Sequence, residues 1–415
     1  MTTSPLQILL RHQNFMLAWW AGLISWIGNG AMFIALPVYV YSRTDSTVAT
    51  ALSVMTGAFA TTVLGQVAGV FVDRWHHRRT LIWVNLALAV VTLAFLIGLN
   101  LPWWTILPVA LAQAALSQFL GPAENALLPT LVGEHLLPAA NSLNALNNNL
   151  ARLIGPALGG VLVARSGFAG VVIMDALSFV LAAGLLLLMR VEDGPHQPAT
   201  TRQPGAFGQE WLAGLRAVQG QPLLMLSFGL AALVGFGEGF ISALMAPWVS
   251  TTLRGGGLEL GYLMSVQAVG GVLAGALLAT FAGRFSTVKL LGWSALLSGL
   301  LLAVIFNYAL VYPILWPALV LTALAGLPFT AWGTAQMLNL QQESVPEVRG
   351  RVFGSYFALF GGAQFLGMAV SGVLGDRLGV QIINVDAMTY LLAGVVALTA
   401  VGRYGRKHLV SPQPD

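Results

Sequence analysis

The feature that most constrains this chain is a succession of long apolar stretches, each bounded by glycine, proline, asparagine or charged residues. A helix needs about 20 mostly apolar residues to cross the hydrocarbon core of a bilayer. In lipid each backbone polar group must be satisfied within its own segment, so runs of this length must be helices. Twelve such helices are predicted, at Phe15–Tyr41, Val48–Val72, Leu81–Leu99, Ile106–Leu128, Ser142–Val163, Gly170–Met189, Leu223–Val249, Gly261–Phe281, Leu290–Asn307, Ile314–Met337, Val352–Gly375 and Ile382–Val401. The sequence therefore predicts an all-α polytopic membrane protein.

The composition agrees and excludes several classes of function. Hydrophobic residues make up 57% of the 415 positions and charged residues 8%, against about a quarter charged in soluble domains. The net charge of +4 is spread along the chain, which is no nucleic-acid footprint. The chain has no cysteine, and it has no phosphate-binding loop or paired helical histidines for a metal. We therefore expect neither an enzyme nor a cofactor or metal; a membrane-embedded enzyme is the weaker alternative.

Basic residues divide unequally between alternate loops when the N-terminus is placed in the cytoplasm. Only four of them then fall outside: Arg43, Arg165, Arg254 and Arg377. This is the asymmetry that the positive-inside rule expects. Each span moves the chain to the other side of the membrane, so the asymmetry appears only if the number of spans before each loop is right. Charge therefore supports twelve spans, with both termini cytoplasmic in the cell membrane.

The longest loop divides the chain in half. Residues 191–221 are polar and rich in Pro, Gly, Gln and Thr, which is typical of a linker. We expect an N-terminal six-helix bundle over residues 12–190, a C-terminal bundle over 222–405 and a cytoplasmic tail over 406–415. Within the linker, Gln209–Val218 could form an amphipathic helix on the membrane surface.

The two halves also repeat one another. Gly155–Leu162 matches Gly367–Leu374, and Asp175–Phe179 matches Asp386–Tyr390 in the same order along the chain. Such a pattern indicates duplication of six helices into two parallel bundles. This organisation resembles the major facilitator fold, in which the substrate site lies near the middle of the membrane between the halves.

The loop between the second and third spans carries a motif. Gly69 is followed by Asp73-Arg74 and then by the basic pair Arg78-Arg79, which resembles the signature of the major facilitator superfamily. The resemblance implies gating by Gly69, Asp73, Arg74 and Arg78. Asp73 would latch onto the N-terminus of the eleventh helix near Arg351, where a helix carries partial positive charge. An ordinary positive-inside loop would explain the arginines but not Gly69 or Asp73.

A second motif narrows the resemblance to exporters. The fifth span contains Gly155-Pro156-Ala157-Leu158-Gly159-Gly160, similar to the glycine-proline motif of drug exporters, which implies a gating role for Gly155 and Pro156. Generic packing of small residues is the alternative. Ala140–Asn144, Asn149–Leu153 and Val345–Arg351 extend the likeness to the macrolide-efflux and enterobactin-exporter branch.

Ionisable residues inside spans are costly and are candidates for function. Glu238, near the middle of the seventh span, is the repeat mate of Asn29. We expect these two to serve proton or substrate coupling, because a carboxyl group at this depth can exchange a proton for substrate; packing across helices is the alternative. Asp175 and Asp386 are candidates for the same role or for a shared structural one.

The remaining ionisable pair, Glu124 and Arg152, is expected to join across the fourth and fifth spans, because an unpaired buried charge is costly. It is a candidate for gating. Aromatic and methionine side chains are weaker candidates for lining a greasy cavity: Trp26, Met32, Phe33, Phe236, Phe240 and Trp332.

These features predict a secondary active transporter that exports a small amphipathic, drug-like or macrolide-like compound in exchange for protons. The expected partners are that compound, protons and membrane lipid, with no nucleic acid, and the expected state is a monomer. A lipid, lysolipid or siderophore transporter of the same fold and a membrane-embedded sensor are the alternatives.

Overall fold

The computed structural model describes residues 5–190, 216, 218–281 and 286–404. The tail over 406–415 and most of the linker over 191–221, including the predicted surface helix Gln209–Val218 apart from residues 216 and 218, lie outside these residues. The chain divides into two compact units. Unit 1 is Met1–Arg202 with Gly255–Ser265, and unit 2 is Gln203–Arg254 with Val266–Asp415. The first division falls inside the predicted linker, whereas Gly255–Ser265 leaves the predicted second bundle and packs with unit 1.

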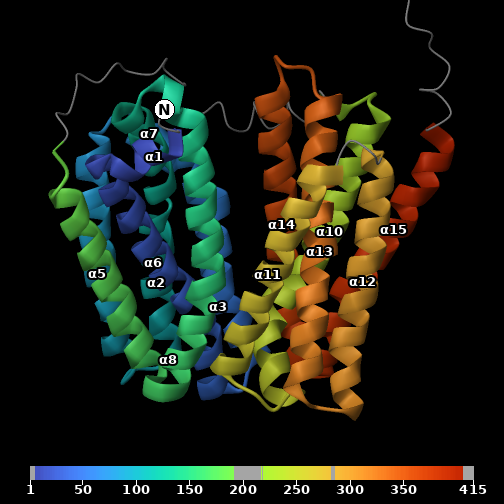
Figure 1. Ribbon diagram of the computed structural model, residues 1–415. Coiled ribbons are helices and arrows are strands. Elements are labelled where there is room, and N and C mark those ends of the chain that lie inside the picture. The colour runs from blue at the N-terminus through green and yellow to red at the C-terminus, as the bar shows by residue number, and fades with distance from the viewer. Residues whose placement is uncertain (1–4, 191–215, 217, 282–285, 405–415) are drawn as a thin grey trace, which may run out of the picture. The chain divides into compact units, whose positions relative to one another are not determined.

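Unit 1 is built from helices (Figure 1). They are α1 (Pro5–Arg11), α2 (Gln13–Thr44), α3 (Thr47–Phe59), the π-helix η1 (Ala60–Leu64), α4 (Gly65–Val72), α5 (His77–Gly98), η2 (Trp103–Thr105), α6 (Ile106–Ser117), α7 (Leu120–Val132), η3 (Glu134–Leu136) and α8 (Leu137–Leu187). The predicted second span is therefore formed by α3, η1 and α4 together, and the fourth by α6 and α7.

Unit 2 contains the remaining helices, apart from the first residues of α11. They are α10 (Pro222–Thr251), α11 (Gly257–Phe281), α12 (Thr287–Val311), α13 (Leu315–Glu343), α14 (Arg349–Leu378), η5 (Val380–Ile383) and α15 (Asn384–Tyr404). Each of the helices α10 to α14 corresponds to one predicted span, and η5 and α15 together form the last one. This confirms the all-α polytopic fold.

Eleven stretches of the described chain are long and apolar enough to cross a membrane. One of them, Glu134–Leu187, has 54 residues and would run about 81 Å as a single helix, more than two bilayer cores. Inside it, Gly167 has φ 66° and ψ −169° and interrupts the helix. A positive φ of this kind is a conformation that glycine adopts readily. The stretch is therefore two spans joined at Gly167, and counting it twice gives the twelve predicted spans.

Small residues bring the same pair of helices together in each unit. In unit 1, α2 packs along α8, and a methyl group built on Gly155 would lie 3.0 Å from the Cα atom of Gly30. In unit 2, α10 packs along α14, and a methyl group on Gly367 would lie 3.1 Å from the Cα atom of Gly239. Close backbone approach at small residues is how membrane helices gain packing energy. The internal repeat is therefore visible as equivalent helix contacts.

Candidate functional site

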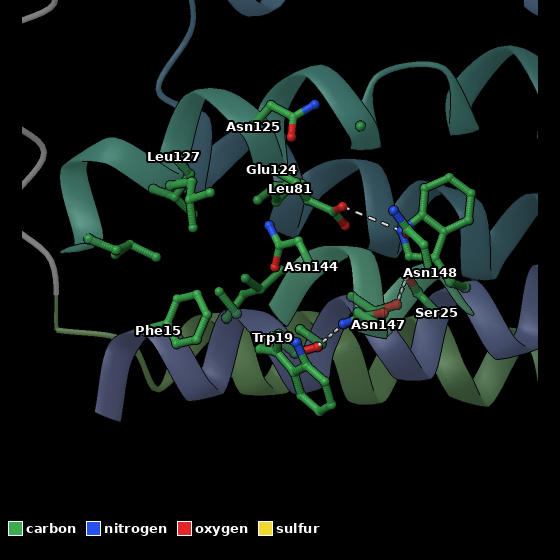
Figure 2. Close-up of a pocket in the computed structure, with 18 of the residues that line it drawn as sticks. Phe15, Trp19, Ser25, Leu81, Glu124, Asn125, Leu127, Asn144, Asn147 and Asn148 are labelled. Atoms are coloured by element: carbon green, nitrogen blue, oxygen red, sulfur yellow. Dashed lines mark hydrogen bonds between the residues drawn. The ribbon is translucent and has the colours of Figure 1, made fainter. Parts of the chain in front are cut away.

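Unit 1 contains a cavity of about 140 Å³. Its walls come from the first half of α2, the start of α5, the middle of α7 and both ends of α8 (Figure 2). Its lining includes apolar side chains such as Phe15, Leu81 and Leu127. It also includes a carboxylate and several asparagines: Glu124, Asn85, Asn125, Asn144, Asn147 and Asn148. The cavity therefore offers both a polar and an apolar surface within one bundle.

Glu124 on α7 supplies the carboxylate of this cavity. Its Oε2 atom accepts a hydrogen bond of 3.4 Å from the indole Nε1 of Trp26 on α2 (Figure 2). Gly22 faces the other oxygen, since a methyl group built there would lie 3.5 Å from Oε1. Arg152 is exposed, and no ion pair joins it to Glu124. The predicted pair is therefore wrong, because α8 turns Arg152 away from the bundle interior.

Two buried asparagines have amide oxygens that accept no hydrogen bond from the described residues. The Nδ2 atom of Asn147 donates to the backbone oxygen of Trp19 at 2.7 Å (Figure 2), and that of Asn85 donates to the oxygen of Leu81 at 2.8 Å. Their Oδ1 atoms are buried and lack a hydrogen-bond partner among the described residues. Neither residue was among the sequence candidates, although polar residues inside a span were the available signal.

A second candidate site lies in unit 2, around Glu238. This half-buried residue on α10 accepts a hydrogen bond of 2.7 Å at Oε1 from the phenol oxygen of Tyr390 on α15. One turn before Tyr390, Asp386 is fully buried, and neither of its carboxyl oxygens has a hydrogen-bond partner among the described residues. A methyl group built on Gly237 would lie 2.9 Å from Asp386 Oδ1. The structure therefore brings Glu238 and Asp386 to one place between α10 and α15.

The equivalent aspartate of unit 1 is held differently. Asp175 is fully buried, and its Oδ2 atom accepts a hydrogen bond of 2.8 Å from Gln113, which also donates to Thr92 at 3.0 Å. Its repeat mate Asp386 has no such amide. Asn29, the mate of Glu238, is half-buried, and its Nδ2 atom has no partner among the described residues. The two units thus share an architecture, but unit 2 has two carboxyls at this place where the described part of unit 1 has Asp175 and Asn29.

The structure places the predicted cavity-lining residues in different surroundings. Trp26 lines the cavity of unit 1, while Met32 is buried in a hydrophobic cluster of the same unit. Phe33 is 62% exposed. In unit 2 the centroid of the Trp332 ring lies 5.6 Å from that of Tyr390, the residue that donates to Glu238.

A second aromatic pair of unit 2 contains the last two candidates. The rings of Phe236 and Phe240 meet edge to face at 5.3 Å. Both residues lie on α10, on either side of Glu238.

The motif after α4 forms a short turn with ordinary backbone angles. The backbone N–H of Asp73 donates to Gly69 at 3.0 Å and ends α4, and the side chains of Asp73 and Arg74 are exposed. His76 is the N-cap residue of α5 and has φ −69°, a backbone angle that any residue can adopt. The eleventh helix is α14 of unit 2, and the latch between it and Asp73 stays a prediction.

Arg78, a predicted gating residue, has a structural role within unit 1. Its Nε and Nη2 atoms donate to the backbone oxygens of Leu186 and Leu187, each at 3.0 Å. These carbonyls lie at the end of α8, where that of Leu186 also accepts from the backbone N–H of Met189 at 3.3 Å, and a cation is favourable at a helix C-terminus. Arg78 therefore joins the start of α5 to the end of α8 through these two hydrogen bonds.

We expect Arg78→Gln to destabilise unit 1 by about 1–3 kcal/mol, because two charge-assisted hydrogen bonds are lost. The measurement is the thermal unfolding midpoint of purified protein. Arg74→Gln, whose side chain is exposed, is the matched control. An unchanged midpoint for Arg78→Gln would show that the capping bonds contribute nothing to stability.

Comparison with known proteins agrees with this architecture. A family model described as transmembrane secretion effector matches residues 3–405. Macrolide efflux protein A of Streptococcus pyogenes is 24% identical over 87% of this chain and 89% of its own. The enterobactin exporter EntS of Citrobacter koseri is 25% identical over 99% and 97%.

Among solved structures, that of a peptide transporter, POT, matches 98% of this chain and 99% of its own with a TM-score of 0.76. At 12% identity this likeness shows the fold alone. Together with the helical architecture and the two repeated units, the family match shows that this chain belongs to the transmembrane secretion effector family of major facilitator transporters.

Proposed function

We propose that this chain is an exporter of a small amphipathic compound, working by alternating access in exchange for protons. It would act in the cell membrane with both termini in the cytoplasm. Membership of a transporter family and efflux relatives support export. The observation that carries proton exchange is the site in unit 2, where Glu238 accepts from Tyr390 beside the unpartnered carboxyl of Asp386.

A charged carboxylate inside a membrane span is costly unless it is paired or protonated. In the described part of unit 2, no basic side chain forms an ion pair with Glu238 or Asp386. A proton is then the simplest way to neutralise this site, and the Tyr390 hydroxyl can stabilise Glu238 when the proton leaves. The two carboxyls therefore suit reversible binding of a proton.

The energy of one proton is sufficient for useful efflux. One charge moved through about 100 mV is worth roughly 2.3 kcal/mol. At about 1.4 kcal/mol for each tenfold change, this sustains a gradient of about fiftyfold. A single exchangeable carboxyl site is therefore enough for the proposed role.

The test is flux in proteoliposomes with an imposed pH gradient and radiolabelled erythromycin as the probe. An exporter accumulates erythromycin on one side above the equilibrium level, and the accumulation disappears when an ionophore collapses the gradient. Saturable binding without flux would instead identify a membrane-embedded sensor.

Export of a siderophore is the second candidate. The observation that favours it is the similarity to an enterobactin exporter along nearly the whole of both chains. The same vesicles loaded with a catecholate siderophore distinguish the two, because an exporter of siderophores would move that compound and leave erythromycin in place. Lysolipid transport is tested by adding a fluorescent lysolipid to these vesicles.

The latch proposed for Asp73 yields a separate prediction. Asp73→Asn removes a charge from a helix N-terminus, an interaction worth about 0.3–1 kcal/mol. We expect the inward-open population to rise about two- to fivefold. The chain has no cysteine, so single cysteines at Ser46 and Val345 report accessibility on the two faces without background labelling.

Asp45→Asn is the matched control for the latch, because Asp45 is an exposed carboxyl in a different loop. It should leave labelling at both positions as in the unsubstituted chain. If Asp73→Asn also leaves labelling unchanged, Asp73 is not a latch.

A further inference from the structure

One face of α13 in unit 2 carries a row of buried polar side chains. The row is Trp332, Gln336 and Asn339, which are 7%, 0% and 4% exposed. Residues three and four apart on a helix are neighbours on its surface, so each member lies one turn from the next. We propose that this α13 row holds ordered water and forms a proton path from Glu238 to the end of the unit where α10 begins. The inference rests on the proposed proton exchange and names the route by which the proton leaves.

Contacts at its two ends place the α13 row inside the unit. At one end, the ring centroid of Trp332 lies 5.6 Å from that of Tyr390, which donates to Glu238 at 2.7 Å. At the other end, the Nδ2 atom of Asn339 donates to the Oγ atom of Ser227 on α10 at 2.7 Å. A helix rises about 1.5 Å per residue, so the row is about 10 Å long. It therefore extends from the carboxyl site toward the start of α10.

The middle of the row has hydrogen-bonding atoms that no other described residue meets. The amide of Gln336 has no partner at its nitrogen or its oxygen, and the indole nitrogen of Trp332 has none. Gly333, one turn before Gln336, leaves room beside them, because a methyl group built there would meet nothing within 4 Å. Buried polar groups without a protein partner are normally bonded to ordered water. An amide and an indole N–H one turn apart supply both donors and an acceptor for such water.

Water in this position can carry a proton that the indole and the amide cannot. The O–H bond of the Glu238 carboxyl breaks as the first water gains the proton, and each later transfer breaks one water O–H bond and forms the next. Trp332 and Gln336 keep the water in line and exchange no proton, so both are positioning residues. The proton leaves at the Asn339 end, which is cytoplasmic in the proposed orientation.

Gln336→Leu tests the path, because it removes the amide and keeps a side chain of similar size. Replacing an unpartnered buried polar group by an apolar one is neutral or stabilising, so the thermal midpoint should stay or rise. Erythromycin-coupled proton flux in proteoliposomes with a fixed pH gradient should slow about tenfold, which corresponds to a barrier higher by about 1.4 kcal/mol. The ratio of this rate in H₂O to that in D₂O should rise, because proton transfer becomes limiting. Exchange of erythromycin for erythromycin moves no net proton and should keep its rate.

Trp332→Phe is the second variant, because it removes the indole N–H and keeps a ring beside Tyr390. We expect it to slow the coupled proton flux and raise the isotope ratio in the same direction as Gln336→Leu. Gln341→Leu and Trp316→Phe are the matched controls, since both residues are exposed positions of the same helix. Neither control should change the flux or the isotope ratio.

The outcomes separate a proton path from a packing role. Coupled flux and isotope ratio that match those of the unsubstituted chain in both Gln336→Leu and Trp332→Phe would exclude the α13 row as the path. A lower thermal midpoint in Gln336→Leu, with erythromycin exchange slowed in parallel, would show that the amide serves packing. If the unsubstituted chain itself moves erythromycin without protons, the proposed proton exchange fails, and this result is distinct from coupled transport that the two variants leave unaltered.

Discussion

Replacing Glu238 by glutamine is expected to abolish uphill efflux while the protein stays folded. Glutamine has nearly the same shape, and its amide oxygen can still accept the hydrogen bond from Tyr390, which Glu238 accepts at 2.7 Å. It cannot bind or release a proton. Accumulation should fall from the level that the imposed pH gradient sustains, about tenfold for each pH unit when one proton is exchanged, to the equilibrium distribution.

The measurement is erythromycin accumulation in proteoliposomes with a fixed pH gradient. Downhill exchange of erythromycin should persist in Glu238→Gln, which separates loss of coupling from loss of folding. Glu134→Gln is the control for a glutamate-to-glutamine change at an exposed position. Normal uphill accumulation by Glu238→Gln would remove this residue from the coupling mechanism.

Adding one methyl group at Gly159 is expected to have the largest effect on stability. A methyl group built there would lie 2.6 Å from both the Cα and the carbonyl oxygen of Ala31 on α2. Backbone atoms cannot rotate away, so α2 and α8 must separate along their length. Overpacking of this kind costs about 1–3 kcal/mol, with further loss where the helices part.

Gly184→Ala on the same helix is the matched control, because nothing lies within 4 Å of the added methyl group. It should be neutral or slightly stabilising, since alanine favours helix more than glycine. The thermal midpoints of both variants, followed by circular dichroism, make the comparison. Equal midpoints would show that α2 and α8 do not pack as tightly as described.

The sequence predicted the spans because hydrophobic length is a local property. Leu223–Val249 became α10 (Pro222–Thr251), for example, within two residues at either end. The π-helix at Ala60–Leu64 inside the second span was not predicted, because hydropathy does not distinguish one hydrogen-bond register of a helix from another. Helical backbone also runs through the predicted break between spans five and six, apart from Gly167.

The candidate sites were less predictable, because they depend on which side chains face each other. Asp175 and Asp386 occupy identical places in the repeat, yet only Asp175 has Gln113 as a partner. Arg152 and Glu124 lie at suitable depths for an ion pair, but the direction of Arg152 on α8 excludes it. Asn85 and Asn147 were not predicted, because a single amide in a span commonly bonds a backbone oxygen. The nitrogen of Asn85 does so within α5, and that of Asn147 does so across to α2.

If substrate leaves as protons enter, the two movements must occur together in opposite directions. Simultaneous measurement of the erythromycin flux and the proton flux tests this most directly. Proteoliposomes with a pH-sensitive dye on the substrate-loaded side are diluted into erythromycin-free buffer of the same pH. Proton movement opposite to erythromycin, in fixed proportion to it and absent in Glu238→Gln, is the predicted result. Erythromycin flux of normal rate without any pH change would contradict proton exchange.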